Sequence, residues 1–191
     1  ATVNWSANGV TQTPVTYNGS LATNATASVN LGNYNFTGIT DIVVWTSMPN
    51  NAADGNTGND TISETYYPAL SGVVTINSAM PTGGTNFNSF NDLQNALNQG
   101  GLGGPLTVNV AAGTYNEQFS LGEITGSSAT NTVTIDGAGA ATLSHDKSIR
   151  NSTLTLEGTS YITISNMTIA ATGGLDSWGI HVWDGAHHVT I

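Results

Sequence analysis

The stretch that decides the fold is LEGTSYITISNMTIAATGGLDSWGIHVWDGAHHVTI, residues 156–191. It contains one alternating phrase twice, TLEGTSYITI and then VWDGAHHVTI, about 26 residues apart. Apolar and polar residues alternate in both copies, as they do in short β-strands, and a glycine marks the bend between the strands. A phrase that returns every 20 to 30 or so residues indicates a solenoid, whose successive laps stack to form the core.

The same alternation extends upstream as pairs of apolar residues, which we arrange in two columns. The first column is Val108/Val110, Val133/Ile135, Leu154/Leu156 and Ile180/Val182. The second column is Phe119/Leu121, Ala141/Leu143, Ile162/Ile164 and Val189/Ile191. Each lap therefore needs at least two short strands. Leucine-rich repeats have a similar period but a helical side and a regular leucine series, so laps made of strands are expected.

One helix is predicted, at about residues 88–99, in NSFNDLQNALNQGG. Its apolar side chains share one face, and two glycines end it; that face comprises Phe90, Leu93, Ala96 and Leu97.

Residues 71–191 resemble the right-handed parallel β-helix of the pectin-lyase-like superfamily. The phrases GPLTVNVAAGTYNEQFSL and TVTIDGAG look like the opening coils of its pectin-esterase-type members. The resemblance implies that the helix at 88–99 caps the end of the coil stack.

Residues 1–70 contain several short alternating segments separated by turns, which suggests a β-sandwich. Strands are expected on both sides of the ANG turn, at 27–31, in GITDIVVWTS and in TISETYY. The phrases VNWSANG, VWTSMPN and DGNTGND resemble an immunoglobulin-like module of large bacterial surface proteins. That family has one or two strands before the tryptophan strand, so an edge or face of this module is expected to be open or filled by a neighbouring chain. The boundary is placed near Pro68 to Gly72.

Charge excludes several functions. The chain has 2 Lys plus Arg, 12 Asp plus Glu and a formal net charge of −10, so it is unsuited to nucleic acid or to polybasic docking on a membrane. No apolar run has the length of a membrane span, so direct insertion is not expected. The polar residues are mainly Asn, Thr, Ser and Gly, and cysteine is absent. We therefore expect an extracellular or cell-surface protein. An apolar last coil without a polar cap leads us to expect a segment of a longer chain.

The loop DGNTGND has one metal-like spacing. Asp54, Asn56 and Asp60 place oxygen-bearing side chains in a glycine-rich turn, as calcium loops do. The alternative is that these side chains hydrogen-bond their own backbone. The histidines show no recurring ligand spacing, so no zinc site is predicted.

The sequence offers two kinds of candidate catalytic group. Asp136, Glu157 and Asp184 each follow a strand of the first column, so we expect them to stack within reach of a carboxylate pair for hydrolysis. The alternative is a row of exposed bend residues. The pectin-lyase-like resemblance also implies elimination with a basic residue, for which Lys147 and Arg150 are the candidates, or else a solvated loop.

His181 and Trp183 are expected to point outward beside Asp184, where an aromatic ring can stack on a sugar; the alternative is a contact with the next coil. Two functions follow. The first is an extracellular structural or adhesive surface protein that binds glycans or other copies of itself, as in a filament. The second is an extracellular polysaccharide lyase or glycoside hydrolase whose active coils lie beyond residue 191.

Overall fold

The computed structural model describes residues 1–146, 151–174 and 177–191. The chain is mostly β-strand and divides into two compact units, Ala1–Tyr67 and Pro68–Ile191. The prediction of an all-β chain is confirmed at this level. No helix among the described residues has the length and apolarity that a membrane crossing requires.

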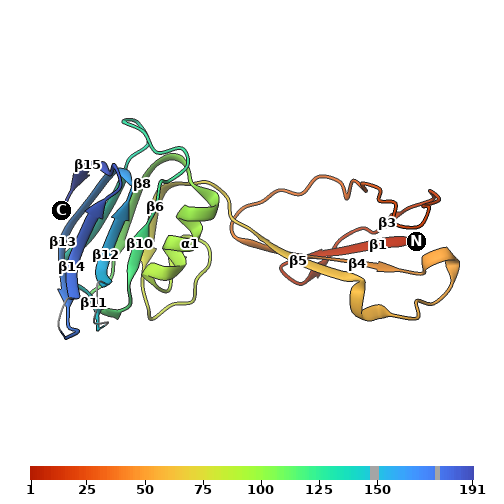
Figure 1. The fold of residues 1–191 in the computed structure, drawn as a ribbon, viewed down its shortest axis with the longest axis horizontal. Helices are drawn as coiled ribbons and strands as arrows, with labels where there is room; N and C mark the ends of the chain where they lie inside the picture. The colour runs from red at the N-terminus through yellow and green to blue at the C-terminus, as the bar shows by residue number, and fades with distance from the viewer. Residues whose placement is uncertain (147–150, 175–176) are drawn as a thin grey trace. The chain divides into compact units, whose positions relative to one another are not determined.

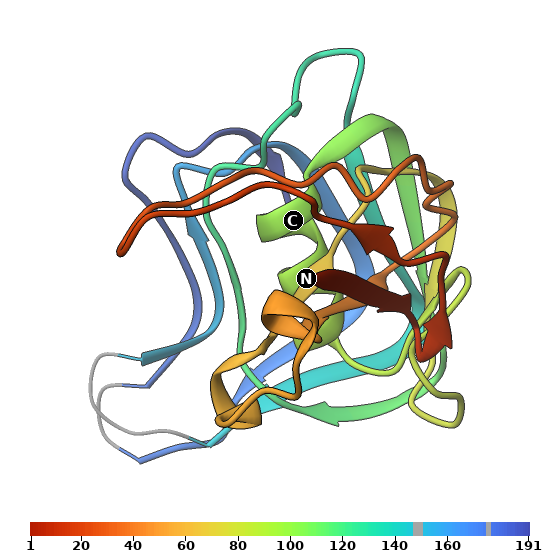
Figure 2. The ribbon, with the colours of Figure 1, turned by 90° about the vertical axis from the view of Figure 1, so that its right-hand side faces the viewer.

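The second unit consists of parallel strands and one α-helix (Figure 1). Its elements are β6 (Leu70–Ile76), β7 (Asn86–Phe87), α1 (Phe90–Gly100), β8 (Leu102–Val110), β9 (Gly113–Asn116), β10 (Phe119–Leu121), β11 (Val133–His145), β12 (Asn151–Glu157), β13 (Ser160–Ala171), β14 (Ser177–Trp183) and β15 (His187–Thr190). The smaller sheet has the order β10-β12-β14. The larger has the order β15-β13-β11-β8-β6-β7, with β9 also paired to β11. Seen along the stack, the strands surround a shared interior (Figure 2).

The strand register shows that successive laps stack on one another. Leu156 lies opposite Val182 on one side and Leu121 on the other, so the repeated phrase does return one lap later on the neighbouring strand. In the larger sheet Ile135 lies between Val108 and Ile164 in the same way. Except at the last lap, these side chains are buried. Each such burial contributes about 1.5 to 3 kcal/mol, so the columns supply the core.

The two predicted columns are wrong in composition, because each of them mixes the two sheets. Val133 belongs to the larger sheet, whereas Leu154 belongs to the smaller one. The cause is that β11 and β13 continue through a bend, with a register shift between Asp136 and Ala141. Each of these laps therefore has three strand segments, within the expectation of at least two. Similar sequence spacings then match residues on different sides of the lap.

Helix α1 covers one end of the stack, next to β6, β7 and β10 (Figure 2). The predicted apolar face is confirmed: Phe90, Leu93, Ala96 and Leu97 are all buried. Ser89 precedes the helix, and its Oγ accepts a hydrogen bond from the Asp92 amide at 3.0 Å.

Two further contacts attach α1 to the lap beneath it. The Glu117 carboxylate accepts hydrogen bonds from the amides of Phe90 at 3.0 Å and Asn91 at 2.9 Å, which are free N–H groups at the start of the helix. The Ser120 amide in β10 donates to Gln94 Oε1 at 2.7 Å. The helix thus provides polar partners as well as an apolar lid.

The first unit contains one antiparallel sheet. Its strands are β1 (Thr2–Ala7), β2 (Val10–Thr11), β3 (Val15–Thr16), β4 (Thr40–Ser47) and β5 (Thr61–Tyr66). The order is β2-β1-β4-β5, with β3 also paired to β1. Short 3₁₀ turns occur at Pro49–Asn51 and Thr57–Asn59. Residues 1–67 are all described, and they form no second sheet of the kind a sandwich requires.

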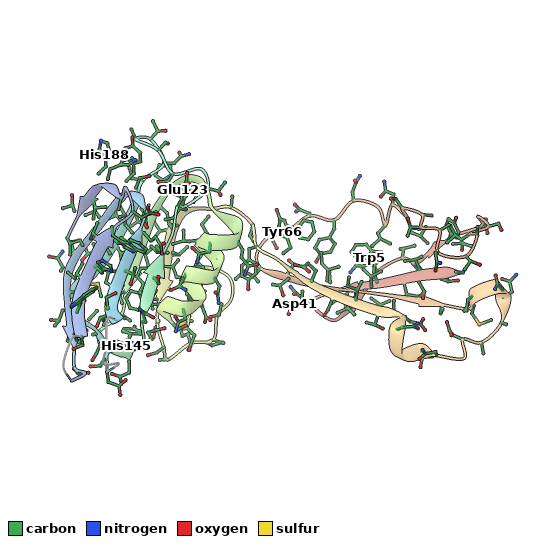
Figure 3. The ribbon with its side chains drawn as sticks, viewed as in Figure 1. Trp5, Asp41, Tyr66, Glu123, His145 and His188 are labelled. Carbon is green, nitrogen blue, oxygen red and sulfur yellow. The ribbon has the colours of Figure 1, made fainter. Side chains whose placement is uncertain are left out.

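The strand predicted at 27–31 is absent, and the segment 17–39 contains no strand. The Gly32 amide donates to Asn30 Oδ1 at 2.8 Å, a local turn that competes with strand pairing. Aromatic residues of this segment nevertheless pack on the sheet. The ring of Tyr34 meets that of buried Trp5 edge to face, with centroids 5.8 Å apart, and the centroids of the Phe36 and Tyr66 rings are 4.1 Å apart. Trp5 and Tyr66 are labelled in Figure 3. The segment therefore covers one face without forming strands.

We expect Glu117→Ala to lower the free energy of unfolding of the second unit by about 1 to 3 kcal/mol, because it removes two hydrogen bonds to a charged acceptor at the helix start. Glu117→Gln keeps one acceptor oxygen and should lose less. Chemical denaturation measures both, with exposed Glu64→Ala in the first unit as the control for charge. Equal losses in Glu64→Ala and Glu117→Ala would contradict the role of Glu117.

A substitution at Gly137 tests how closely successive laps pack. A Cβ there would lie 2.4 Å from Met167 Cβ and 2.6 Å from the Asn166 carbonyl oxygen. Gly137→Ala should therefore cost about 1 to 3 kcal/mol of unfolding free energy. Gly122→Ala is the matched control, since nothing lies within 4 Å of its Cβ position. If both variants unfold at the same denaturant concentration, the laps are not packed as described.

Candidate functional site

Acidic side chains gather where each lap leaves the smaller sheet. Glu123 and Asp184 come shortly after β10 and β14, and Glu157 is the last residue of β12; we name these three residues the acidic corner. Glu157 lies opposite Trp183, and a Cβ on Gly158 would lie 3.4 Å from the Asp184 carbonyl oxygen. All three acids are exposed. Glu157 and Asp184 thus lie at the ends of neighbouring strands, and their use as a carboxylate pair stays a prediction.

Sequence reasoning missed Glu123. It follows Leu121 by two positions, as Asp184 follows Val182 by two, and the register links Leu121 to Leu156 and Leu156 to Val182. The signal was present but was hidden by the wrong assignment of the apolar columns.

Asp136 lies elsewhere, and the expectation that it stacks with Glu157 and Asp184 is wrong. It lies in the larger sheet, opposite Asn109 and Ser165. Its Oδ1 accepts hydrogen bonds from the Ala138 amide at 2.9 Å and from Asn166 Nδ2 at 3.0 Å. The Ala138 amide first, and then the Asn166 amide group, lower the pKa of the Asp136 carboxyl. Asp136 therefore stabilises a bend and its contact with the next lap.

Aromatic rings form a row along β14. The His181 ring lies 5.5 Å from that of Trp183, almost parallel at 3°, and 4.7 Å from that of Trp178, edge to face. Trp178 is 40% exposed and Trp183 is 46% exposed. We name Trp178, His181 and Trp183 the aromatic row.

Polar groups stand beside the row on β12. Thr155 is opposite His181, and Glu157 is opposite Trp183. Exposed aromatic faces can stack on the C–H face of a sugar ring, while a neighbouring hydroxyl or carboxylate can bond to its hydroxyl groups. This combination is suited to contact with a carbohydrate.

The proposed calcium loop has another use for two of its oxygens. Asp54 Oδ1 accepts from the Asn56 amide at 2.8 Å, and Asn56 Oδ1 accepts from the Gly58 amide at 3.3 Å. The backbone carbonyl of Asp60 accepts from the Thr46 amide at 3.1 Å. These bonds explain Asp54 and Asn56 as turn residues, and calcium binding by Asp54, Asn56 and Asp60 stays a prediction.

The described residues contain no group of three or more His, Cys, Asp or Glu side chains arranged to hold a metal ion. The elimination candidates Lys147 and Arg150 lie outside the described residues. Among the histidines, His188 lies at the same edge of the second unit as Glu123, and His145 lies at the opposite edge (Figure 3).

The lowered pKa of Asp136 predicts a pH effect. A carboxylate whose pKa is depressed by folding stabilises the fold above its unfolded pKa of about 3.9, and this contribution is lost as pH falls through the folded value. Asp136→Ala should therefore melt a few degrees below the wild type at neutral pH, and the gap should narrow in acid. Asp136→Asn keeps the acceptor oxygen and should melt closer to the wild type. A gap in melting temperature that stays constant into strong acid would contradict this prediction.

Comparisons with known proteins identify no relative: no protein-family model, no curated protein and no solved structure matches the chain.

Proposed function

We propose that this chain is a segment of an extracellular, cell-surface structural or adhesive protein that contacts glycans through the aromatic row. In this proposal residues 1–70 are an immunoglobulin-like module and residues 71–191 are the first coils of a right-handed parallel β-helix of the pectin-lyase-like superfamily. The observation that carries the proposal is the row itself, in which two exposed tryptophans and a histidine stand along one strand of a stack of rigid laps.

Several features support the architecture within this proposal. Parallel strands that pair one lap apart, a shared apolar interior and a helix over one end are typical of a parallel β-helix. Crossovers between parallel strands are almost always right-handed, which favours that hand. The single antiparallel sheet around buried Trp5 is compatible with one sheet of an incomplete immunoglobulin-like module, which is what this proposal requires.

The negative charge of the chain limits which classes of glycan can bind. With a formal net charge of −10 and with Glu157 and Asp184 at the end of the row, uronate-rich polysaccharides would be repelled. Neutral sugars and amino sugars would not be. We therefore propose neutral or amino-sugar glycans as ligands, bound by stacking on Trp183 and Trp178 and by hydrogen bonds to Glu157.

Other copies of the chain are the second proposed partner. Strand β5 is at the edge of its sheet, and its Ile62 side chain is 68% exposed. An unpaired strand edge with an exposed apolar side chain is where a strand of another copy can add.

Calorimetric titration with a panel of neutral and amino-sugar oligosaccharides tests the glycan proposal. Trp183→Ala should raise the dissociation constant about tenfold, equivalent to about 1.4 kcal/mol, through loss of the stacking surface. Trp183→Phe keeps an aromatic face and should recover part of the affinity. Ile62→Ala, on the first unit, is the control for loss of an exposed apolar side chain.

Unchanged affinity in Trp183→Ala, or no binding to any member of the panel, would overturn the proposal. A polysaccharide lyase or glycoside hydrolase is the second candidate, favoured by the shared corner of Glu123, Glu157 and Asp184. Incubation with pectin-like and alginate-like polysaccharides distinguishes the two functions. Release of shortened or unsaturated products would favour the enzyme over the adhesive role.

A further inference from the structure

Two neighbouring histidines meet at the beginning of β15. The Nδ1 atoms of His187 and His188 are 2.7 Å apart, and both side chains are exposed. Their rings are steeply inclined to each other, at 79°. The contact joins two ring nitrogens of consecutive residues, which a regular strand does not allow, because consecutive side chains point to opposite faces.

The backbone explains how the two rings meet. His188 has a φ of 52°, in the left-handed region that is uncommon for residues with a side chain. This conformation interrupts the alternation and brings its ring to the side of His187. Tyr161 on the neighbouring strand β13 has a φ of 55°, next to the paired residues Ser160 and His187. The same irregularity therefore occurs in two successive laps.

Tyr161 also holds both imidazoles in place. Its ring stacks on that of His188 at 4.6 Å and 15°, and meets that of His187 edge to face at 5.5 Å. The orientation of the two Nδ1 atoms is thus fixed by a third ring from the adjacent lap. Sites that are pre-positioned in this way lose less conformational freedom on binding a ligand.

The chemistry of the contact points to a metal ion. A ring nitrogen can bond to another only if one carries a proton and the other offers its lone pair. If that proton moves to Nε2 of the same ring, the Nδ1 atoms of both rings offer a lone pair, 2.7 Å from each other. Neutral imidazole nitrogens in this arrangement are good ligands for transition metals.

The distance selects among these metals. With a metal–nitrogen bond of about 2.0 Å, two ligands at a right angle are about 2.8 Å apart, whereas two tetrahedral ligands are about 3.3 Å apart. The observed 2.7 Å therefore fits adjacent positions of a square or tetragonal site, the geometry of Cu²⁺ and Ni²⁺. It fits tetrahedral Zn²⁺ poorly.

We propose that His187 and His188 bind Cu²⁺ through their Nδ1 atoms, as adjacent ligands of a tetragonal site whose other positions are taken by solvent. Cu²⁺ binds such donors more tightly than Ni²⁺ or Zn²⁺. No third metal-binding side chain completes the site within the described residues, so water must supply the remaining ligands. This inference stands independently of the glycan proposal, since it uses neither the aromatic row nor the acidic corner.

Titration of the whole chain with Cu²⁺, followed by calorimetry and electron paramagnetic resonance, tests the proposal. We expect one ion per chain at this site and a spectrum with two nitrogen donors. His187→Ala and His188→Asn should each weaken binding at least about tenfold. Asn tolerates the left-handed backbone, so His188→Asn avoids a failure to fold. Tyr161→Phe should bind normally, and Tyr161→Ala should bind more weakly.

His181→Gln is the matched control, because it removes a histidine that makes no contact with the pair within the described residues, and its Cu²⁺ affinity should not change. Circular dichroism confirms that each variant is folded. Equal Cu²⁺ affinity in the wild type, His187→Ala and His188→Asn would overturn the proposal. Tighter binding of Zn²⁺ than of Cu²⁺ would overturn it as well, since the tetragonal geometry would then be wrong.

Discussion

The second unit depends on parallel backbone pairing between one lap and the next. A single lap is too thin to bury an apolar side chain, and only when a second lap lies about 4.8 Å away does each column of side chains become a core. Leu121, Leu156 and Val182 form one such column; Leu156 lies between two strands, Leu121 lies on a strand between β12 and α1, and both are fully buried. The pairing also fixes, lap by lap, which bend residues become neighbours. Core and candidate site therefore come from one register.

The sequence predicted the strand register only where two similar phrases follow each other within one sheet. The phrase at 156 and 182 repeats within one sheet, and the structure pairs Leu156 with Val182 as expected. The helix was also predictable, because its four apolar side chains and its glycine stop lie within a few residues of one another. Both signals are contained in one short window, where spacing alone decides the structure.

Lengths that vary between laps could not be predicted. Val133 and Leu154 are separated by a spacing that matches one lap, yet β11 turns through a bend between them and places them in different sheets. Because of the same error, Asp136 was predicted to stack with Glu157 and Asp184, and Glu123 was not predicted as a site residue. At 27–31 the alternation was genuine but the segment has no strand partner, so its aromatic successors Tyr34 and Phe36 pack as a loop. Alternation predicts which side chains point inward, and pairing alone decides whether a strand forms.

The corner beside the smaller sheet shows a second kind of limit. Tyr161, Asp184 and His188 all have positive φ values, a conformation that sequence patterns assign to glycine or asparagine. Each such residue lowers the free energy of unfolding by about 1 to 2 kcal/mol, and interactions within one short segment do not offset that loss.

These residues keep positive φ values because the neighbouring lap supplies a ring or a hydrogen-bond partner that stabilises them. The Tyr161 ring lies on the His188 ring, and the Gly158 amide donates to the Trp183 carbonyl at 3.2 Å. Contacts between laps thus stabilise the strained backbone at these corners. The positive φ values in turn direct side chains toward one another that a regular strand would keep apart. In strands the period of two keeps neighbouring side chains apart; at the corner that rule is relaxed, and the rings of His187 and His188 meet each other and that of Tyr161 from the preceding lap. For this reason the corners of the coil, rather than its strands, are where this fold can assemble a site.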